Sequence, residues 1–124
     1  MRMRKNRVQK FSLRNRITEK DREGITVEKW GPDVEISCEL WPAGGKVQAE
    51  VYGQRLAYIL NGKIQGDYTI AVDEKGSISY QFNGFSVREG DGICFHAPAQ
   101  SDPDYKIISI KPYRPLYMEL EKRL

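Results

Sequence analysis

Side chains suited to catalysis or metal binding are few in this sequence, and they form no recognisable set. The one histidine, His96, lies two residues after Cys94, without the second histidine or Cys-x-x-Cys pair that would complete a metal site. The run Glu89-Gly-Asp-Gly92 has too few oxygen ligands for a calcium loop and is typical of a turn. Neither a Gly-x-x-x-x-Gly-Lys phosphate loop nor a Gly-x-Ser-x-Gly nucleophile elbow occurs. We therefore expect no catalytic residue, no metal, no cofactor and no enzyme activity; a hydrolase built on paired carboxylates is the weaker alternative.

Basic side chains gather at the N-terminus and could serve binding. Residues 1–16 carry seven basic and no acidic side chains, whereas the rest of the chain carries thirteen basic and seventeen acidic ones, so +7 and −4 give the net charge of +3. Such an arm suits contact with nucleic acid or an acidic protein surface, and a solvated terminus is the alternative. We expect residues 1–7 to be a mobile arm, and we assign partner contact to Arg2, Arg4, Lys5, Arg7 and Lys10.

The segments that would position these residues alternate apolar and polar side chains. The alternation is clearest near the C-terminus, where Leu116, Met118 and Leu120 share one face, as in a half-buried strand. Two prolines in the preceding turn, Lys111-Pro-Tyr-Arg-Pro115, block a helix, so residues 105–122 should form a hairpin. Similar patterns predict strands over 8–19, 25–30, 34–41, 55–60, 68–72, 77–82, 85–87 and 93–96, with turns that include Gly31-Pro-Asp33 and Asn61-Gly62.

Strands at roughly ten-residue spacing indicate one all-β domain. The chain of 124 residues, 40% hydrophobic, can bury one modest core, and its apolar runs are too short for a membrane span or a signal peptide. Cys38 and Cys94 are expected to be reduced, buried residues of a cytosolic protein. We predict a small antiparallel β-barrel of about six to eight strands over residues 8–124, with a long irregular loop or short helix after the third strand. Its core should include Ile36, Leu40, Ile110, Met118 and Leu120.

The irregular segment after the third predicted strand is the least strand-like part of the chain. Pro42-Ala-Gly-Gly-Lys46 can bend freely. Residues 47–52 fit either one or two helical turns or an extended arm that pairs with neighbouring copies. An ordinary surface loop is the alternative to a functional role.

The order of these features resembles the phage head–tail joining family, the head-completion or stopper adaptors. The matching features are a basic opening strand, a charged turn with Gly24, a strand ending in Trp30, the strand over 34–41, the glycine-rich segment 45–53, a Gly-Asp-Gly turn and the closing hairpin. The similarity covers about residues 8–122. This sequence departs from compact members over 63–87, where Asp73-Glu-Lys-Gly76 adds an expected hairpin.

The resemblance implies a homo-oligomeric ring below the portal that joins head to tail and helps to retain packaged DNA. Its partners would be portal or adaptor proteins above, tail-completion proteins below and DNA in the channel, with no membrane. The protein would occupy the host cytoplasm during assembly and then the virion or phage-like particle. In such adaptors the segment after the third strand projects into the channel, and the matching positions here are Pro42, Ala43, Gly44, Gly45, Lys46, Val47, Gln48, Ala49, Glu50, Val51, Tyr52, Gly53 and Gln54.

The main alternative is a small OB-like or SH3-like barrel that binds nucleic acid directly. It would use the basic arm and tyrosines such as Tyr58, Tyr68 and Tyr80, whose rings can stack on bases. Against this alternative, the body is acidic, and the aromatic residues are not interleaved with Lys or Arg along any one strand.

Overall fold

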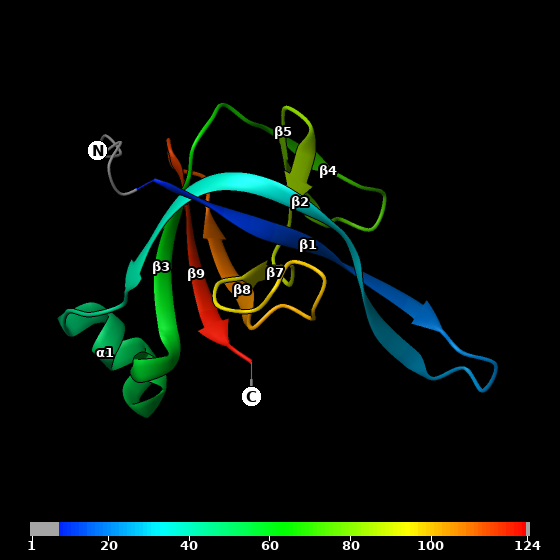
Figure 1. Cartoon of the computed structure of the whole chain (residues 1–124), viewed down its shortest axis with the longest axis horizontal. Coiled ribbons are helices and arrows are strands. Elements are labelled where there is room, and N and C mark those ends of the chain that lie inside the picture. Colours follow the sequence, from blue (N-terminus) through cyan, green and yellow to red (C-terminus); the bar gives the residue numbers. More distant parts are fainter. Residues whose placement is uncertain (1–7, 124) are drawn as a thin grey trace.

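Strands dominate the computed structural model, which describes residues 8–123. Six strands close into an antiparallel barrel in the order β1-β2-β3-β9-β8-β7, and β4-β5-β6 form a separate three-stranded sheet (Figure 1). This architecture confirms the predicted all-β fold. The elements are β1 (Gln9–Lys20), β2 (Thr26–Pro42), α1 (Lys46–Tyr52), the 3₁₀ helix η2 (Gly53–Tyr58), β3 (Ile59–Ile64), β4 (Thr69–Val72), β5 (Ile78–Phe82), β6 (Phe85–Val87), β7 (Gly92–Cys94), β8 (Tyr105–Lys111) and β9 (Leu116–Lys122).

The barrel interior holds the inward-facing residues of these strands. Ile36, Ile110, Met118 and Leu120 are buried as predicted, whereas Leu40 is half-buried and packs against the edge of the core. Removing such side chains from water is the main force that holds a domain of this size together. Further buried members of the core are Leu13, Cys38, Leu60, Ile64, Tyr68, Tyr80, Val87, Ile93, Ile107 and Leu116.

The predicted break at Gly31-Pro-Asp33 is wrong, because β2 runs through it without interruption. The register between β1 and β2 shifts there: Arg14 pairs with Asp33 and Arg16 with Trp30, so Asn15 faces two residues of β2. Such a bulge accommodates a proline, which has no backbone N–H to donate. The predicted second and third strands are therefore one, and the irregular segment follows it.

The prediction of a strand over 55–60 and a turn at Asn61-Gly62 is also wrong. Residues 53–58 form η2, and Asn61 and Gly62 lie within β3. A Cβ at Gly62 would come within 2.7 Å of Leu40 Cδ2 and 2.8 Å of Met118 Cε. Glycine occupies this position because neighbouring side chains fill the space, a reason that turn statistics do not contain.

Both hairpins expected in the second half of the chain are present. β8 pairs with β9, and β4 pairs with β5 around the turn at residues 73–76. Asp73 Oδ1 accepts hydrogen bonds from the backbone N–H groups of Lys75 and Ser77, both at 2.9 Å or less, which fixes this turn. Cys38 and Cys94 are free and buried, and burial raises the pKa of the Cys38 thiol to about 12.

Two parts of the chain extend from the barrel on opposite sides. α1 lies beside β3 on one side, and the paired ends of β1 and β2 project as a ribbon on the other (Figure 1). A two-stranded ribbon has little stability of its own in water. The barrel therefore presents two extensions that it does not enclose.

Candidate functional site

The segment predicted to face a channel, Pro42 to Gln54, is held outside the barrel. Pro42 ends β2, residues 43–45 form a link, 46–52 form α1, and 53 and 54 begin η2. The structure thus selects the helical alternative for residues 47–52 over the extended arm. Gly45 and Gly53, with φ of 89° and 57°, bound α1 in the left-handed region that glycine adopts most readily.

Neither α1 nor η2 contains a buried residue. Val47 and Val51, one helical turn apart, are 74% and 68% exposed, and Tyr58 is also exposed. An apolar stripe on a helix normally faces a core, but this one faces solvent. The segment therefore gains little from apolar burial within its own chain.

Polar contacts attach this segment to the outer face of β3 and β9. Gln48 Nε2 donates to Asn61 Oδ1 at 2.6 Å and to Glu119 Oε2 at 2.7 Å, and Gln48 Oε1 accepts from the Gly44 N–H at 3.1 Å. Asn61 and Glu119 are buried beneath these bonds. Partial burial, reinforced by the nearby Glu119 carboxylate, raises the pKa of Tyr52 from 10 to about 12.

A charged pair adds a second attachment point. Arg55 donates two hydrogen bonds to the carboxylate of Glu121, with Nε–Oε2 at 2.7 Å and Nη2–Oε1 at 2.6 Å. The bonds from Arg55 hold the pKa of Glu121 below its ordinary value of 4.5. Both groups lie at the surface, where such pairs contribute little to stability.

The proposed basic arm is mostly outside the described residues. Arg2, Arg4, Lys5 and Arg7 fall there, and the expectation that they contact a partner stays a prediction. Lys10 is described: it lies exposed on β1, and its Nζ is 3.2 Å from Glu35 Oε1 on β2. This basic position is therefore paired within its own chain.

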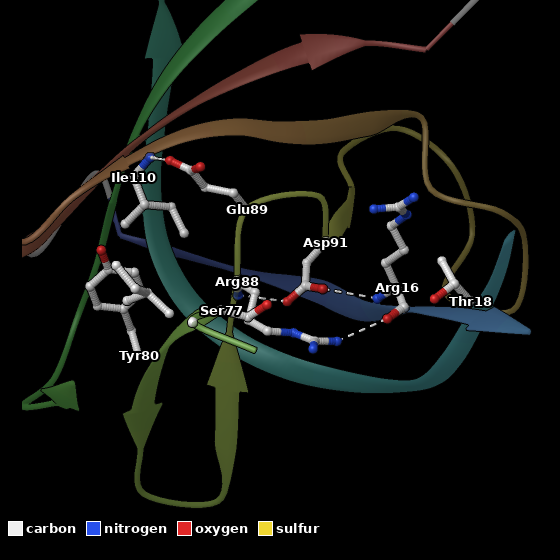
Figure 2. Close-up of a pocket in the computed structure, with 10 residues that line it drawn as sticks. Arg16, Thr18, Ser77, Tyr80, Arg88, Glu89, Asp91 and Ile110 are labelled. Atoms are coloured by element: carbon white, nitrogen blue, oxygen red, sulfur yellow. Dashed lines mark hydrogen bonds between the residues drawn. The ribbon is translucent and has the colours of Figure 1, made fainter. Parts of the chain in front are cut away.

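A pocket of about 600 Å³ lies between β1, the β4–β5 hairpin and β8 (Figure 2). Its acidic residues, Glu89 and Asp91, accept hydrogen bonds from backbone N–H groups of the same chain. Glu89 Oε2 accepts the Ile110 N–H, and the fully buried Asp91 accepts the backbone N–H groups of Arg16 and Arg88 at 2.9 and 2.8 Å. Burial raises the pKa of Asp91 despite these bonds. The two carboxylates thus brace the chain around the pocket, and the Glu89-Gly-Asp-Gly92 turn has the structural role expected of it.

Other groups singled out in the sequence lie apart from the pocket. His96 is exposed just beyond β7, with its ring 4.3 Å from that of Phe95. Within residues 8–123 no three His, Cys, Asp or Glu side chains are arranged to hold a metal ion. The described part of the chain also contains no helix that is long and apolar enough to span a membrane.

Two of the three tyrosines proposed to stack on bases are unavailable. Tyr68 and Tyr80 are buried, with ring centroids 5.8 Å apart, and only Tyr58 is exposed. The sequence pattern did not distinguish these buried tyrosines from the exposed one, because Tyr68 lies just before a strand and packs inward from a loop.

A surface that the sequence did not reveal lies next to the attachment of α1. We call it the aromatic–basic strip; it comprises Trp41 on β2, Lys63 on β3, Tyr117 on β9, and Lys111 and Tyr113 at and beyond the end of β8. Lys63 Nζ lies 5.8 Å from the centre of the Trp41 ring, and Lys111 Nζ lies 5.7 Å from that of Tyr117. The sequence could indicate only that each of these residues points outward from its own strand, because it does not give the order of the strands in the barrel.

Comparison with protein-family models, with curated proteins and with solved structures finds no significant match for this chain.

Proposed function

We propose that this protein is a structural connector of a phage or prophage-derived particle, without enzyme activity. Copies would form a ring below the portal, join head to tail and help to retain packaged DNA. The small closed barrel and the order of features along the chain support this proposal, because both agree with the head–tail joining family that the sequence resembles.

The observation that carries the proposal is the exposure of the α1–η2 segment, residues 46–58. Thirteen residues, seven in α1 and six in η2, stand outside the barrel without a single buried residue, and two valines of α1 face solvent. Such a segment suits a role in which its packing partners are equivalent segments of neighbouring copies around a channel. In a ring, one surface of each subunit meets a different surface of the next.

Exposed apolar side chains elsewhere also suit contact between copies. They occur on the β1–β2 ribbon, at Ile17 and Ile25, and on the β4–β5 hairpin, at Ile70, Val72 and Ile78. Scattered exposed apolar residues are common, but these are grouped on the β1–β2 ribbon and on one hairpin of the small three-stranded sheet. Neighbouring copies would cover them in a ring.

Replacement of the segment tests the proposal. In a variant with a Gly-Ser linker of equal length in place of residues 43–52, we expect a cooperative fold, since α1 contains no buried residue. Heads assembled with the portal and capsid proteins of the same genome should still bind a ring of this variant, seen by electron microscopy, but should leak DNA, measured as nuclease-sensitive DNA.

A matched control replaces the exposed residues Gln65 and Asp67, in the loop after β3, with serine and keeps Gly66; it should leave DNA retention unchanged. If the 43–52 variant unfolds, the segment is needed for the fold. If heads that carry this variant retain all their DNA, the segment is a passive loop. If the unaltered chain binds no heads and stays monomeric while binding DNA, it is the direct nucleic-acid binder instead.

A further inference from the structure

We infer that the aromatic–basic strip is a binding surface for the phosphate backbone of DNA. In the direct-binding alternative, aromatic residues would have been interleaved with Lys or Arg along one strand. The barrel achieves a similar arrangement across four strands. This inference rests on the proposed function in placing DNA beside the strip, and it is tested separately from ring assembly.

Strand register places the central residues of the strip in one row. Lys63 pairs with Tyr117, and Tyr117 pairs with Lys111, so the two lysines flank the tyrosine on β3, β9 and β8. Strand spacing puts their backbones about 10 Å apart. All three side chains point out of the barrel, because their neighbours Ile64, Leu116 and Ile110 point into it. The row therefore places a lysine on each side of Tyr117 on the outer face of the barrel.

Aromatic rings, rather than carboxylates, position the key cations. Lys111 lies over Tyr117, and Arg114, in the turn that follows, lies 4.1 Å from the centre of the Tyr68 ring. Four other basic groups of the described surface meet acids instead: Lys10 with Glu35, Arg16 with Glu28, Lys29 with Glu19, and Arg55 with Glu121. A carboxylate cancels the charge of its partner, whereas a ring holds a cation and leaves its charge available.

The chemistry of the strip favours phosphate over stacked bases. Trp41 and Tyr117 are half-buried, and a lysine already lies over each ring. Tyr113 is 60% exposed and lies 6.3 Å from Tyr117, so one open ring borders the cations. Lys63 pairs in register with the acidic Glu39 across β2 and β3, so the cations assigned to phosphate are Lys111 in the row and Arg114 in the turn beyond it.

The strip also adjoins the α1–η2 segment. Tyr117 donates its hydroxyl proton to Asn61 Oδ1 at 2.8 Å, and the same oxygen accepts the bond from Gln48 of α1. Both surfaces thus share the outer face of β3 and β9. If α1 faces the channel of a ring, the strip borders that channel and meets the DNA backbone there.

Charge neutralisation tests this inference. The strip variant carries Lys111→Gln in the strip and Arg114→Gln in the turn next to it. The control carries Arg22→Gln and Lys75→Gln, two exposed positions on other hairpins with the same change in charge. Binding of a fluorescent 20-base-pair DNA duplex to the full chain is measured by anisotropy over a range of salt concentrations. We expect the strip variant to bind more weakly and its salt slope, log K against log salt, to fall by about one per cation removed. The control should bind like the unaltered chain.

The same pair of changes is made in a chain in which Arg2, Arg4, Lys5 and Arg7 are glutamine, so that the N-terminal residues cannot mask the effect. Equal losses in the strip variant and the control, or no binding by the unaltered chain at low salt, would overturn the inference. If rings form on heads but the strip variant binds DNA as well as the control does, the inference is wrong and the proposed function stands. DNA binding through the strip without rings would overturn the proposed function alone.

Discussion

β9 and α1 are each seven residues long, and they show how differently this fold uses its chain. In β9, Leu116, Met118 and Leu120 are completely buried. In α1 no residue is buried, and the two valines face solvent. The closing strand supplies the apolar contacts that stabilise the barrel, whereas the helix is an attachment whose sequence the barrel does not dictate.

The two elements nevertheless meet at one residue. Glu119 points outward from β9 between buried neighbours, and its carboxylate accepts the bond from Gln48 of α1. A hydrogen bond to a carboxylate contributes about 1.5–3 kcal/mol, similar to the burial of one large apolar side chain, whereas β9 buries three such side chains. Changes in β9 should therefore alter global stability, and changes in α1 should alter mainly its own docking.

The largest effect is expected from Leu120→Ala in β9. This substitution removes a fully buried side chain and should lower the free energy of unfolding by roughly 2–4 kcal/mol in chemical denaturation. A loss below about 0.5 kcal/mol would show that the closing hairpin is not part of the core.

The next largest effect is expected from the addition of one methyl group, which should destabilise the barrel but not the region of α1. Gly62→Ala places a Cβ against Leu40 and Met118 inside the barrel and should cost about 1–3 kcal/mol. Its control, Gly44→Ala, adds the same group before α1, where no atom lies within 4 Å, and should change stability by less than about 0.5 kcal/mol. Equal losses in thermal denaturation would contradict the distinction between a packed barrel and an open segment.

Removal of the polar attachment should have a smaller and more local effect. Gln48→Ala leaves Asn61 and Glu119 without their contacts to α1, at a cost of about 1–2 kcal/mol. Hydrogen exchange at the amides of α1 should become faster, while exchange in β9 changes only with global stability. Glu50→Ala, an exposed change on the same helix, is the control. Unchanged exchange in α1 would show that these bonds do not hold the segment.

The smallest effect is expected from Arg55→Ala, and it should depend on pH. Glu121 has a lowered pKa in the folded protein because Arg55 bonds its carboxylate, so the pair stabilises the fold above the unfolded pKa of about 4.5. This contribution disappears as the pH falls through the folded pKa. The melting temperatures of the variant and the unaltered chain should therefore differ slightly at pH 7 and converge in acid. A difference that grows in acid would show that Arg55 acts through another group.

Local alternation in the sequence was enough to predict much of the barrel. Leu116, Met118 and Leu120 recur at the period of a strand, and the prolines at 112 and 115 leave a turn as the connection. The glycines that bound α1 marked an irregular segment for the same local reason. These features depend on neighbours in the chain, so a single sequence contains them.

Contacts between distant residues decided the rest. β2 continues through Gly31 and Pro32 because Asn15, on another strand, accommodates the bulge, and Gly62 is needed because Leu40 and Met118 fill its surroundings. The aromatic–basic strip depends on the same cause: Trp41, Lys63, Lys111 and Tyr117 are separated by up to 76 positions, and only the strand order β2-β3-β9-β8 brings them onto one face. Periodicity defines which way a side chain points from its strand, whereas strand order and register determine which side chains it meets.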